Sequence, residues 1–211
     1  MFSDVKLGLR NALLLVLLTY FSFLMLEITL QYIPVDLDVA FLRIKQDVIR
    51  LTHYQIAFFI HVFTSMFALL AGFTQFSFFL RKKYPLVHRG IGKLYVIVIL
   101  LLSGPSGLIM GYYANGGWSS QWAFMLLAMM WMYTTWKALS TARSKQFDQH
   151  RYWMIRSYAL TLSAITLRFW KWLIVGIFEP APMDVYRIVA WMGWIPNLLL
   201  AEFIIYKNKK G

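Results

Sequence analysis

The chain has 211 residues, of which 60% are hydrophobic and 14% are charged. A soluble domain is usually ~45–50% apolar and about 25% charged, so the composition excludes an ordinary soluble protein and indicates a multi-pass membrane protein. The absence of cysteine excludes disulfides, thiolate-held haem or iron–sulfur clusters, and cysteine nucleophiles. The net charge of +12 does not indicate nucleic-acid binding, because the charges flank apolar segments.

Six segments contain the ~20 apolar residues that a helix needs to cross a bilayer. We expect these spans at residues 9–32, 54–80, 88–114, 118–142, 150–178 and 186–206. The first has a basic start at Lys6 and Arg10, but its apolar run is too long for a signal peptide and no small-residue cleavage site follows it. No long linker divides the chain. We therefore predict an all-α integral membrane protein with a single domain over residues 1–211, built as a six-transmembrane-helix bundle.

Lysine and arginine are distributed unevenly between the two sides of this predicted bundle. Fifteen fall on the side of both termini: Lys6, Arg10, Arg81, Lys82, Lys83, Arg89, Lys93, Lys137, Arg143, Lys145, Arg151, Arg156, Lys207, Lys209 and Lys210. Four fall on the other side: Arg43, Lys45, Arg50 and Arg187. Because basic loops remain in the cytoplasm, we predict a bacterial inner-membrane protein whose two termini are cytoplasmic and whose main surroundings are the lipid bilayer.

The segment after the first predicted span has an amphipathic period. Its apolar residues Leu37, Phe41, Ile44, Val48 and Leu51 are spaced three or four apart, and charged residues fill most of the intervening positions. This spacing predicts an amphipathic helix over about residues 36–51, which either lies on the outer membrane surface or caps the bundle.

Two prolines fall inside predicted spans. Pro105, after Gly104, is in the middle of the third span, and Pro196 is in the sixth. Proline removes a backbone donor and kinks a helix, and membrane helices tolerate this. We expect a break at each position, which serves either to open a cavity or only to pack the helices.

Polar stripes on three helices indicate which faces point into the bundle. The stripes are His61, Ser65, Ala68, Gly72 and Gln75 in the second span, His88, Gly92, Tyr95 and Ser106 in the third, and His150, Ser157, Thr161 and Arg168 in the fifth. Small and polar residues in membrane helices usually face other helices. The fourth span has no ionisable residue before Lys137, so we predict that it is a packing helix.

His88 and His150 each open a span from the same side, so they are expected at equal depth on different helices. This is the arrangement of a bis-imidazole b-type haem in a helical bundle, with Arg89, Arg151 and Arg156 available to the propionates. The alternative is that both histidines only hydrogen-bond to loops or lipid headgroups. His61 lies roughly 28 Å along its helix axis from this level, so a shared three-histidine metal site is not expected.

A second group of polar residues is expected at outer depth. Glu27 and Arg168 are a natural ion pair, with His61 and Lys171 at comparable depth. Such a group would either fasten helices together or form a proton relay or a site for an anionic or quinone-like headgroup. At the opposite end, Glu202 would pair with one of three arginines: Arg89, Arg151 or Arg156.

Several of these residues fall in recognisable motifs. The motifs are His61 with Gly72 and Gln75; Leu86-Val87-His88-Arg89 with Gly92 and Tyr95; His150 to Ser157 with Ala159-Leu160-Thr161 and Thr166-Leu167-Arg168; and Trp194-Ile195-Pro196-Asn197-Leu198 with Ala201-Glu202. Over about residues 54–206 the chain resembles the bacterial predicted-membrane-protein family called Domain of Unknown Function 2306. The resemblance implies a membrane fold and singles out His61, His88, His150, Arg168 and Glu202, but it implies no substrate.

Three functions remain open at this point. The first is a redox membrane protein that binds one haem b through His88 and His150 and exchanges electrons with a quinone or another membrane partner. The second is a small transporter or permeation protein that uses a buried polar cluster, and the third is an accessory subunit of a membrane complex. The predicted buried polar cluster comprises Glu27, His61, Gln75, Ser157, Thr161, Arg168, Asn197 and Glu202.

Overall fold

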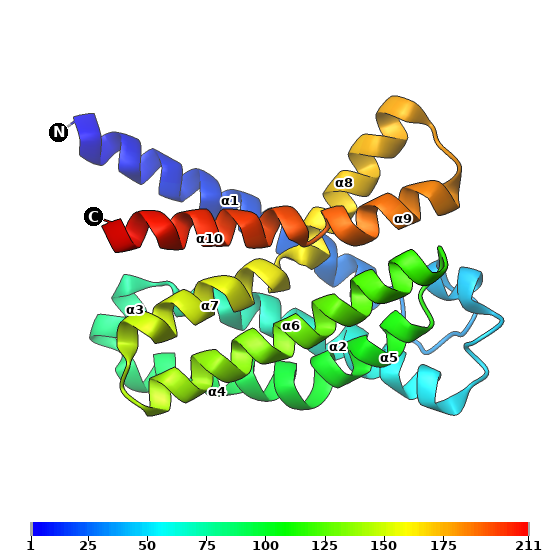
Figure 1. Ribbon diagram of the computed structural model, residues 1–211, viewed down its shortest axis with the longest axis horizontal. Helices are drawn as coiled ribbons and strands as arrows, with labels where there is room; N and C mark the ends of the chain where they lie inside the picture. The colour runs from blue at the N-terminus through cyan, green and yellow to red at the C-terminus, as the bar shows by residue number, and fades with distance from the viewer. Residues whose placement is uncertain (1, 211) are drawn as a thin grey trace. The chain divides into compact units, whose positions relative to one another are not determined.

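A computed structural model describes the backbone of residues 2–210 and the side chains of residues 13, 16, 17 and 19–210. Over that range the chain forms helices and turns without a strand, which confirms the predicted all-α class (Figure 1). The chain divides into two compact units, residues 1–46 and residues 47–211. The single domain therefore stays a prediction, and the basic start at Lys6 and Arg10 lies outside the described side chains.

The first unit contains α1 (Phe2–Leu30) and a short 3-10 helix, η1 (Ala40–Lys45). The predicted amphipathic α-helix over residues 36–51 is wrong, because only η1 and flanking turns form there. Ala40 has a left-handed backbone with φ 48°, and a right-handed helix cannot continue through such a residue. The buried side chains of η1 are Leu42 and Lys45, one position beyond the predicted apolar residues Phe41 and Ile44.

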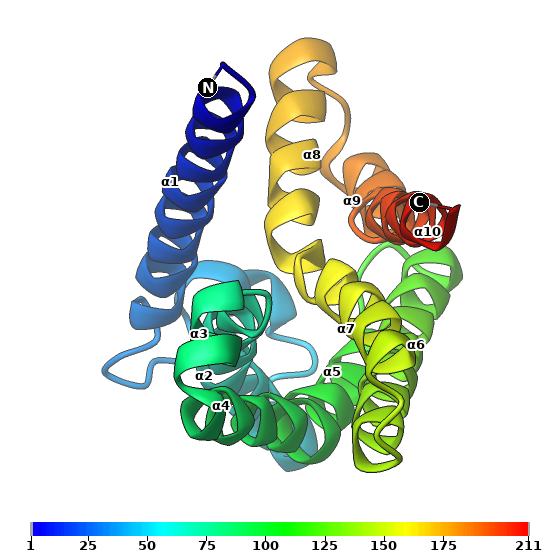
Figure 2. The same ribbon diagram turned by 90° about the vertical axis from the view of Figure 1, so that its left-hand side faces the viewer.

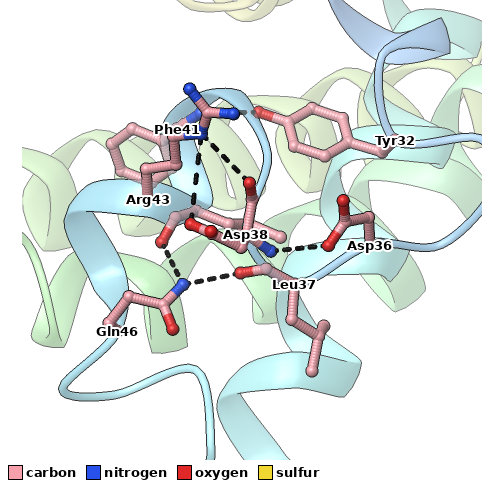
Figure 3. Close-up of polar contacts among 8 residues, drawn as sticks. Tyr32, Asp36, Leu37, Asp38, Phe41, Arg43 and Gln46 are labelled. Carbon is pink, nitrogen blue, oxygen red and sulfur yellow. Dashed lines mark hydrogen bonds and ion pairs between the residues drawn. The ribbon is translucent and has the colours of Figure 1, made fainter.

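Side chains of this segment bond to its own backbone (Figure 3). The Asp36 carboxylate accepts from the Asp38 N–H at 2.8 Å, and Arg43 Nε donates to the Asp38 carbonyl at 3.0 Å. Gln46 Nε2 donates to the Leu37 carbonyl at 2.7 Å. Such local contacts offer the backbone an alternative to helical hydrogen bonds. They explain why the amphipathic period does not become an α-helix.

The second unit carries most of the helices. They are α2 (Thr52–Gln75), α3 (Phe78–Lys83), α4 (Pro85–Ile97), the π-helix η2 (Val98–Ser103), α5 (Gly104–Tyr112), α6 (Trp118–Arg143), α7 (Phe147–Thr161), α8 (Ser163–Phe178), α9 (Pro182–Met192) and α10 (Ile195–Lys210). Three stretches are long and apolar enough to cross a membrane: Thr52–Gln75, Pro85–Tyr112 and Pro182–Lys210. The pair α7 and α8, bent by 40°, makes a fourth if it is one span. Among the described residues the structure thus supports three or four spans, and six are not confirmed.

Two predicted spans differ from the helices that form. α6 occupies the predicted fourth span, but it is not among the apolar stretches, because serine, threonine, glutamine, tryptophan and tyrosine interrupt its sequence. The predicted second span, residues 54–80, is too long. It ends at Gln75, and the Ser77 hydroxyl then accepts from the Leu80 N–H at 3.3 Å to begin α3.

Within the second unit the helices pack lengthwise. α6 lies between α5 and α7, α2 packs against α4, η2, α5 and α7, and α10 packs against α7 (Figures 1 and 2). α3, the α6–α7 connection and the end of α10 all lie at one end of this unit, which we call the basic end (Figure 1). Its defining residues are Arg81, Lys82, Lys83, Arg143, Lys145, Lys207, Lys209 and Lys210.

Three helix breaks interrupt these stretches. The break expected at Pro105 is present as the π-helix η2, in which the Gly104 N–H bonds to the Ile99 carbonyl. The break expected at Pro196 separates α9 from α10 just before that residue. The bend between α7 and α8, at Leu162, was not predicted, because neither proline nor glycine marks it. All three leave backbone carbonyls that need donors from elsewhere.

The closest helix approach supplies the first testable prediction. A Cβ added at Gly72 would lie 2.5 Å from Tyr158 Cδ2 and 2.8 Å from Tyr95 Cε2. Both rings are buried and cannot retreat. Gly72→Ala should therefore lower stability by about 1–3 kcal/mol, the usual cost of overpacking, measured as thermal unfolding in detergent. Gly90→Ala is the matched control, since nothing lies within 4 Å of its added Cβ. If the two variants unfolded at the same temperature, the close packing at Gly72 would be contradicted.

Candidate functional site

A cluster of buried hydroxyl groups joins three helices around Tyr95. The Tyr95 hydroxyl, from α4, lies 2.7 Å from Ser157 Oγ and 2.9 Å from Thr161 Oγ1, both on α7. Thr135 of α6 bonds to Ser157 at 2.7 Å, and Trp131 Nε1 donates to Thr161 at 2.9 Å. Every one of these residues is buried. Since each hydroxyl has a partner, the cluster fastens α4, α6 and α7 together.

The sequence analysis named three of the five residues in this cluster. Ser157 and Thr161 were predicted to be buried, and Tyr95 was placed on an inward stripe. Trp131 and Thr135 were missed, because α6 was interpreted as a packing helix on the ground that it has no ionisable residue before Lys137. The available signal was the Trp131-to-Thr135 spacing of four, which puts an indole donor and a hydroxyl on one face of a helix.

His61 lies beside the break in the α4–α5 stretch. Its Nδ1 is 2.8 Å from the Ser103 carbonyl, and Ser106 Oγ donates to the same carbonyl at 3.2 Å. Thr64 Oγ1 bonds to the Ser103 hydroxyl at 2.7 Å. Pro105 has no N–H to give to the preceding turn. Polar side chains from α2 and α5 thus contact the Ser103 carbonyl and hydroxyl beside this break.

The contact with Ser103 fixes the tautomer of His61. A carbonyl only accepts, so Nδ1 carries the proton and Nε2 presents a lone pair. Gly107 gives the ring room, because a Cβ there would lie 3.0 Å from His61 Cε1. The charge of Arg168 also acts on this ring. An imidazole held in this way can accept a proton or a hydrogen bond at Nε2.

His88 and His150 lie within electrostatic reach of each other at the basic end. His150 Nδ1 is 2.8 Å from the Ala138 carbonyl, so it too presents its lone pair at Nε2. His88 is half-buried, and its Nδ1 is buried without a hydrogen-bond partner among the described residues. The charges of Arg81 and Arg89 also act on His88. The pair therefore sits in a positive environment.

The arginines predicted beside this pair have different surroundings. Arg156 forms a two-fold ion pair with Glu202, with Nε–Oε1 at 2.5 Å and Nη2–Oε2 at 2.7 Å. Its guanidinium also stacks 4.6 Å above the Trp153 ring. Arg89 and Arg151 are exposed. Of the three arginines considered for Glu202, Arg156 is the one that binds it.

The other residues of the predicted polar cluster lie apart from one another. Asn197 Nδ2 donates to the Ala159 carbonyl at 3.1 Å and to Thr166 Oγ1 at 2.9 Å, which ties α10 to α7 and α8. Gln75 lies against Gly92, where an added Cβ would be 2.9 Å from its Oε1. These contacts join helices, as expected for polar groups inside a membrane bundle.

Arg168 and Glu27 belong to different units of the chain, so the ion pair predicted between them is not tested. Arg168 lies beyond the Leu162 bend, is exposed, and donates from Nη1 to the Ala164 carbonyl at 2.7 Å. The bend means that His150, Ser157, Thr161 and Arg168 do not form one stripe on a continuous helix. Glu27 belongs to the first unit and is exposed, so the Glu27–Arg168 ion pair stays a prediction.

The part of the chain that the structure describes gives no support for a metal site built from three or more side chains. There, no group of three or more histidine and carboxylate side chains is placed to hold an ion. A two-histidine haem site does not require such a group, because the porphyrin supplies the other ligands.

The fold and these sites define an α-helical membrane protein with polar side chains concentrated at helix breaks and at the basic end. The chain belongs to the family of predicted membrane proteins called Domain of Unknown Function 2306, which matches residues 58–205. The resemblance inferred from the motifs is thus confirmed, while a bacterial origin, the inner membrane and the direction of the termini stay predictions. No curated protein and no solved structure matches the chain.

Replacing Tyr95 by phenylalanine tests the hydroxyl cluster. Tyr95→Phe removes two hydrogen bonds and should lower stability by about 1–2 kcal/mol. Tyr112→Phe, in the same stretch but 61% exposed, is the control and should melt like the parent protein. The measurement is thermal unfolding of both variants in the same detergent. A Tyr95→Phe variant as stable as its control would show that the cluster does not fasten the helices.

Proposed function

We propose that the chain is a redox membrane protein that binds one haem b between His88 and His150. The observation that carries this proposal is the orientation of His150 by the Ala138 carbonyl. A metal-bound histidine usually donates its other ring N–H to such a group, which holds the ring and raises the basicity of the ligand nitrogen. His150 Nε2 meets that requirement.

The surroundings of His88 support the second ligand. A buried ring nitrogen without a partner costs free energy, and a bound metal centre would remove that cost at Nδ1. The two histidines come from two different helices, α4 and α7, which both pack against α2. Two imidazoles are a suitable donor set for haem b, which when bound would supply reversible one-electron transfer.

The charge around the pair favours an anionic ligand. Arg81 and Arg89 act on His88, and the sequence contains no carboxylate between Asp47 and Asp148. Propionates would find several cations there. We assign this role to Arg89 and Arg151, because Arg156 is already held by Glu202.

Absorption spectroscopy of the detergent-purified full chain, produced in cells given a haem precursor, tests the proposal. We expect a Soret band and, after reduction, a sharp low-spin alpha band. His88→Ala and His150→Ala should each abolish the low-spin signature, because one axial ligand is lost. His88→Met should keep a ligand and shift the reduction potential upwards.

The control for this experiment is His53→Ala. His53 bonds to the Tyr113 hydroxyl at 2.7 Å, at the end of the unit remote from the basic end, so its loss should leave the spectrum unchanged. A folded but colourless parent protein would overturn the haem proposal. So would a spectrum that persists in both alanine variants.

The polar side chains around the helix break beside His61 favour a second function. We propose, as the alternative, a path for protons or a small solute through the bundle at this point, since polar groups inside a membrane protein commonly mark such pathways. The unprotonated Nε2 of His61 would accept a proton from solvent or from a quinol hydroxyl. A quinone is accordingly the membrane partner that we propose for either function, near His61 and Arg168.

Proton uptake by proteoliposomes that contain a pH-sensitive dye tests this alternative. An imposed potential should drive acidification with the parent protein and with His53→Ala, but not with His61→Ala. A flux equal to that of empty vesicles, or one unchanged by His61→Ala, would contradict a path through His61. If neither colour nor flux is found in stable protein, the accessory-subunit hypothesis remains.

A further inference from the structure

We propose that α3 forms a binding site for the headgroup of an anionic phospholipid. The residues Phe78, Phe79, Lys82 and Lys83 line an open hollow of about 460 Å³. All four come from one helix of the connection between α2 and α4. The hollow contains neither histidine of the pair, and its proposed ligand does not depend on haem binding.

The position of α3 places it at a membrane boundary. Only residues 76–84 connect Thr52–Gln75 to Pro85–Tyr112, and both of these stretches are long and apolar enough to cross a bilayer. So short a connection between two spans must remain at the level of the lipid headgroups. The hollow therefore opens where phosphate groups are concentrated.

The charges of this connection have no acidic partner among the residues whose side chains the structure describes. Arg81, Lys82 and Lys83 are consecutive, and within the described residues none of them forms an ion pair. The nearest acidic residues in sequence are Asp47 and Asp148. An anionic headgroup supplies the missing counter-charge, and lysines just outside a span are attracted to anionic lipid.

The aromatic rings set the geometry of the hollow. Lys82 Nζ lies 5.7 Å from the Phe78 ring centre, and Lys83 Nζ lies 5.4 Å from that of Phe79. The two phenylalanines are 66% and 58% exposed, respectively. The ammonium groups therefore lie over the ring faces, and both lysines are exposed, so they remain accessible to an anion. A phosphate would meet the two ammonium groups while the rings contact the glycerol and first methylenes of the lipid.

This arrangement favours an acidic headgroup over a zwitterionic one. A choline or ethanolamine group would bring a third cation towards Lys82 and Lys83, whereas a glycerol headgroup would not. The phosphate is shared by both lipid classes, so net headgroup charge decides the preference. Free phosphate lacks the apolar part that the phenylalanines contact and should bind far more weakly.

Native mass spectrometry of the detergent-purified full chain, titrated with short-chain phosphatidylglycerol or phosphatidylcholine, tests the proposal. We expect one preferred phosphatidylglycerol per chain, bound at least about tenfold more tightly than phosphatidylcholine, because each lysine near an anionic lipid adds attraction. The double variant Lys82→Gln/Lys83→Gln should lose that preference. Lys82→Arg/Lys83→Arg should keep most of it, since the charges remain.

The matched control removes the same charge elsewhere at the basic end. Lys209→Gln/Lys210→Gln deletes two lysines that also lie over aromatic rings, Tyr152 and Tyr206. It should retain the phosphatidylglycerol preference. An equal loss in this control would overturn the proposal in favour of diffuse attraction. Equal binding of the two lipids, or complete displacement of the lipid by millimolar inorganic phosphate, would overturn it as well.

Discussion

The backbone hydrogen bonds lost at three helix breaks are the constraint on which the rest of the structure depends. In apolar surroundings an unsatisfied carbonyl is costly, so irregular backbone survives only where other donors reach it. His61 and Ser106 supply donors at the Pro105 break. Thr166 and Asn197 supply them to the Gly193 carbonyl before Pro196. Several of the polar side chains inside the second unit are therefore placed by the breaks, before any ligand is considered.

The bend at Leu162 shows how one irregularity supports another. Thr166 donates to the Gly193 carbonyl, and Asn197 donates to the Ala159 carbonyl before the bend at 3.1 Å, so two neighbouring side chains serve breaks on different helices. Asn197 donates to the Thr166 hydroxyl and thereby fixes its orientation. The hydroxyl cluster of Ser157 and Thr161 lies directly before the same bend. The α7–α8 turn is thus held from both sides, although no proline or glycine marks it.

Hydropathy and proline positions were sufficient to predict the helical class, several spans and two of the breaks. They could not predict the Leu162 bend, because its cause lies in hydrogen bonds from residues distant in sequence. Nor could they predict the role of α6, whose Trp131 and Thr135 matter through partners on α4 and α7. The helix predicted around Ala40 does not form, and the reason is local. Hydrogen bonds from side chains to the backbone compete there with the helical hydrogen bonds that the amphipathic spacing predicts. For the candidate sites, stripes on single helices identified Ser157 and Thr161, but not the contacts that complete them.

Some polar side chains in this bundle have all their hydrogen bonds made inside the protein, and others keep a free donor or acceptor. We interpret the first group as structural and the second as functional. Tyr95, Ser157 and Thr161 already bond to one another, and Asn197 and Glu202 are bonded as well, so a ligand could reach them only by breaking existing contacts. The imidazoles differ. His61 and His150 each use Nδ1 on a backbone carbonyl and keep a lone pair at Nε2, while His88 has a buried nitrogen that the described residues leave unbonded. Binding at these three rings adds interactions without removing any. Chemistry in this protein is therefore expected at the histidines, with the hydroxyl cluster holding their helices in register.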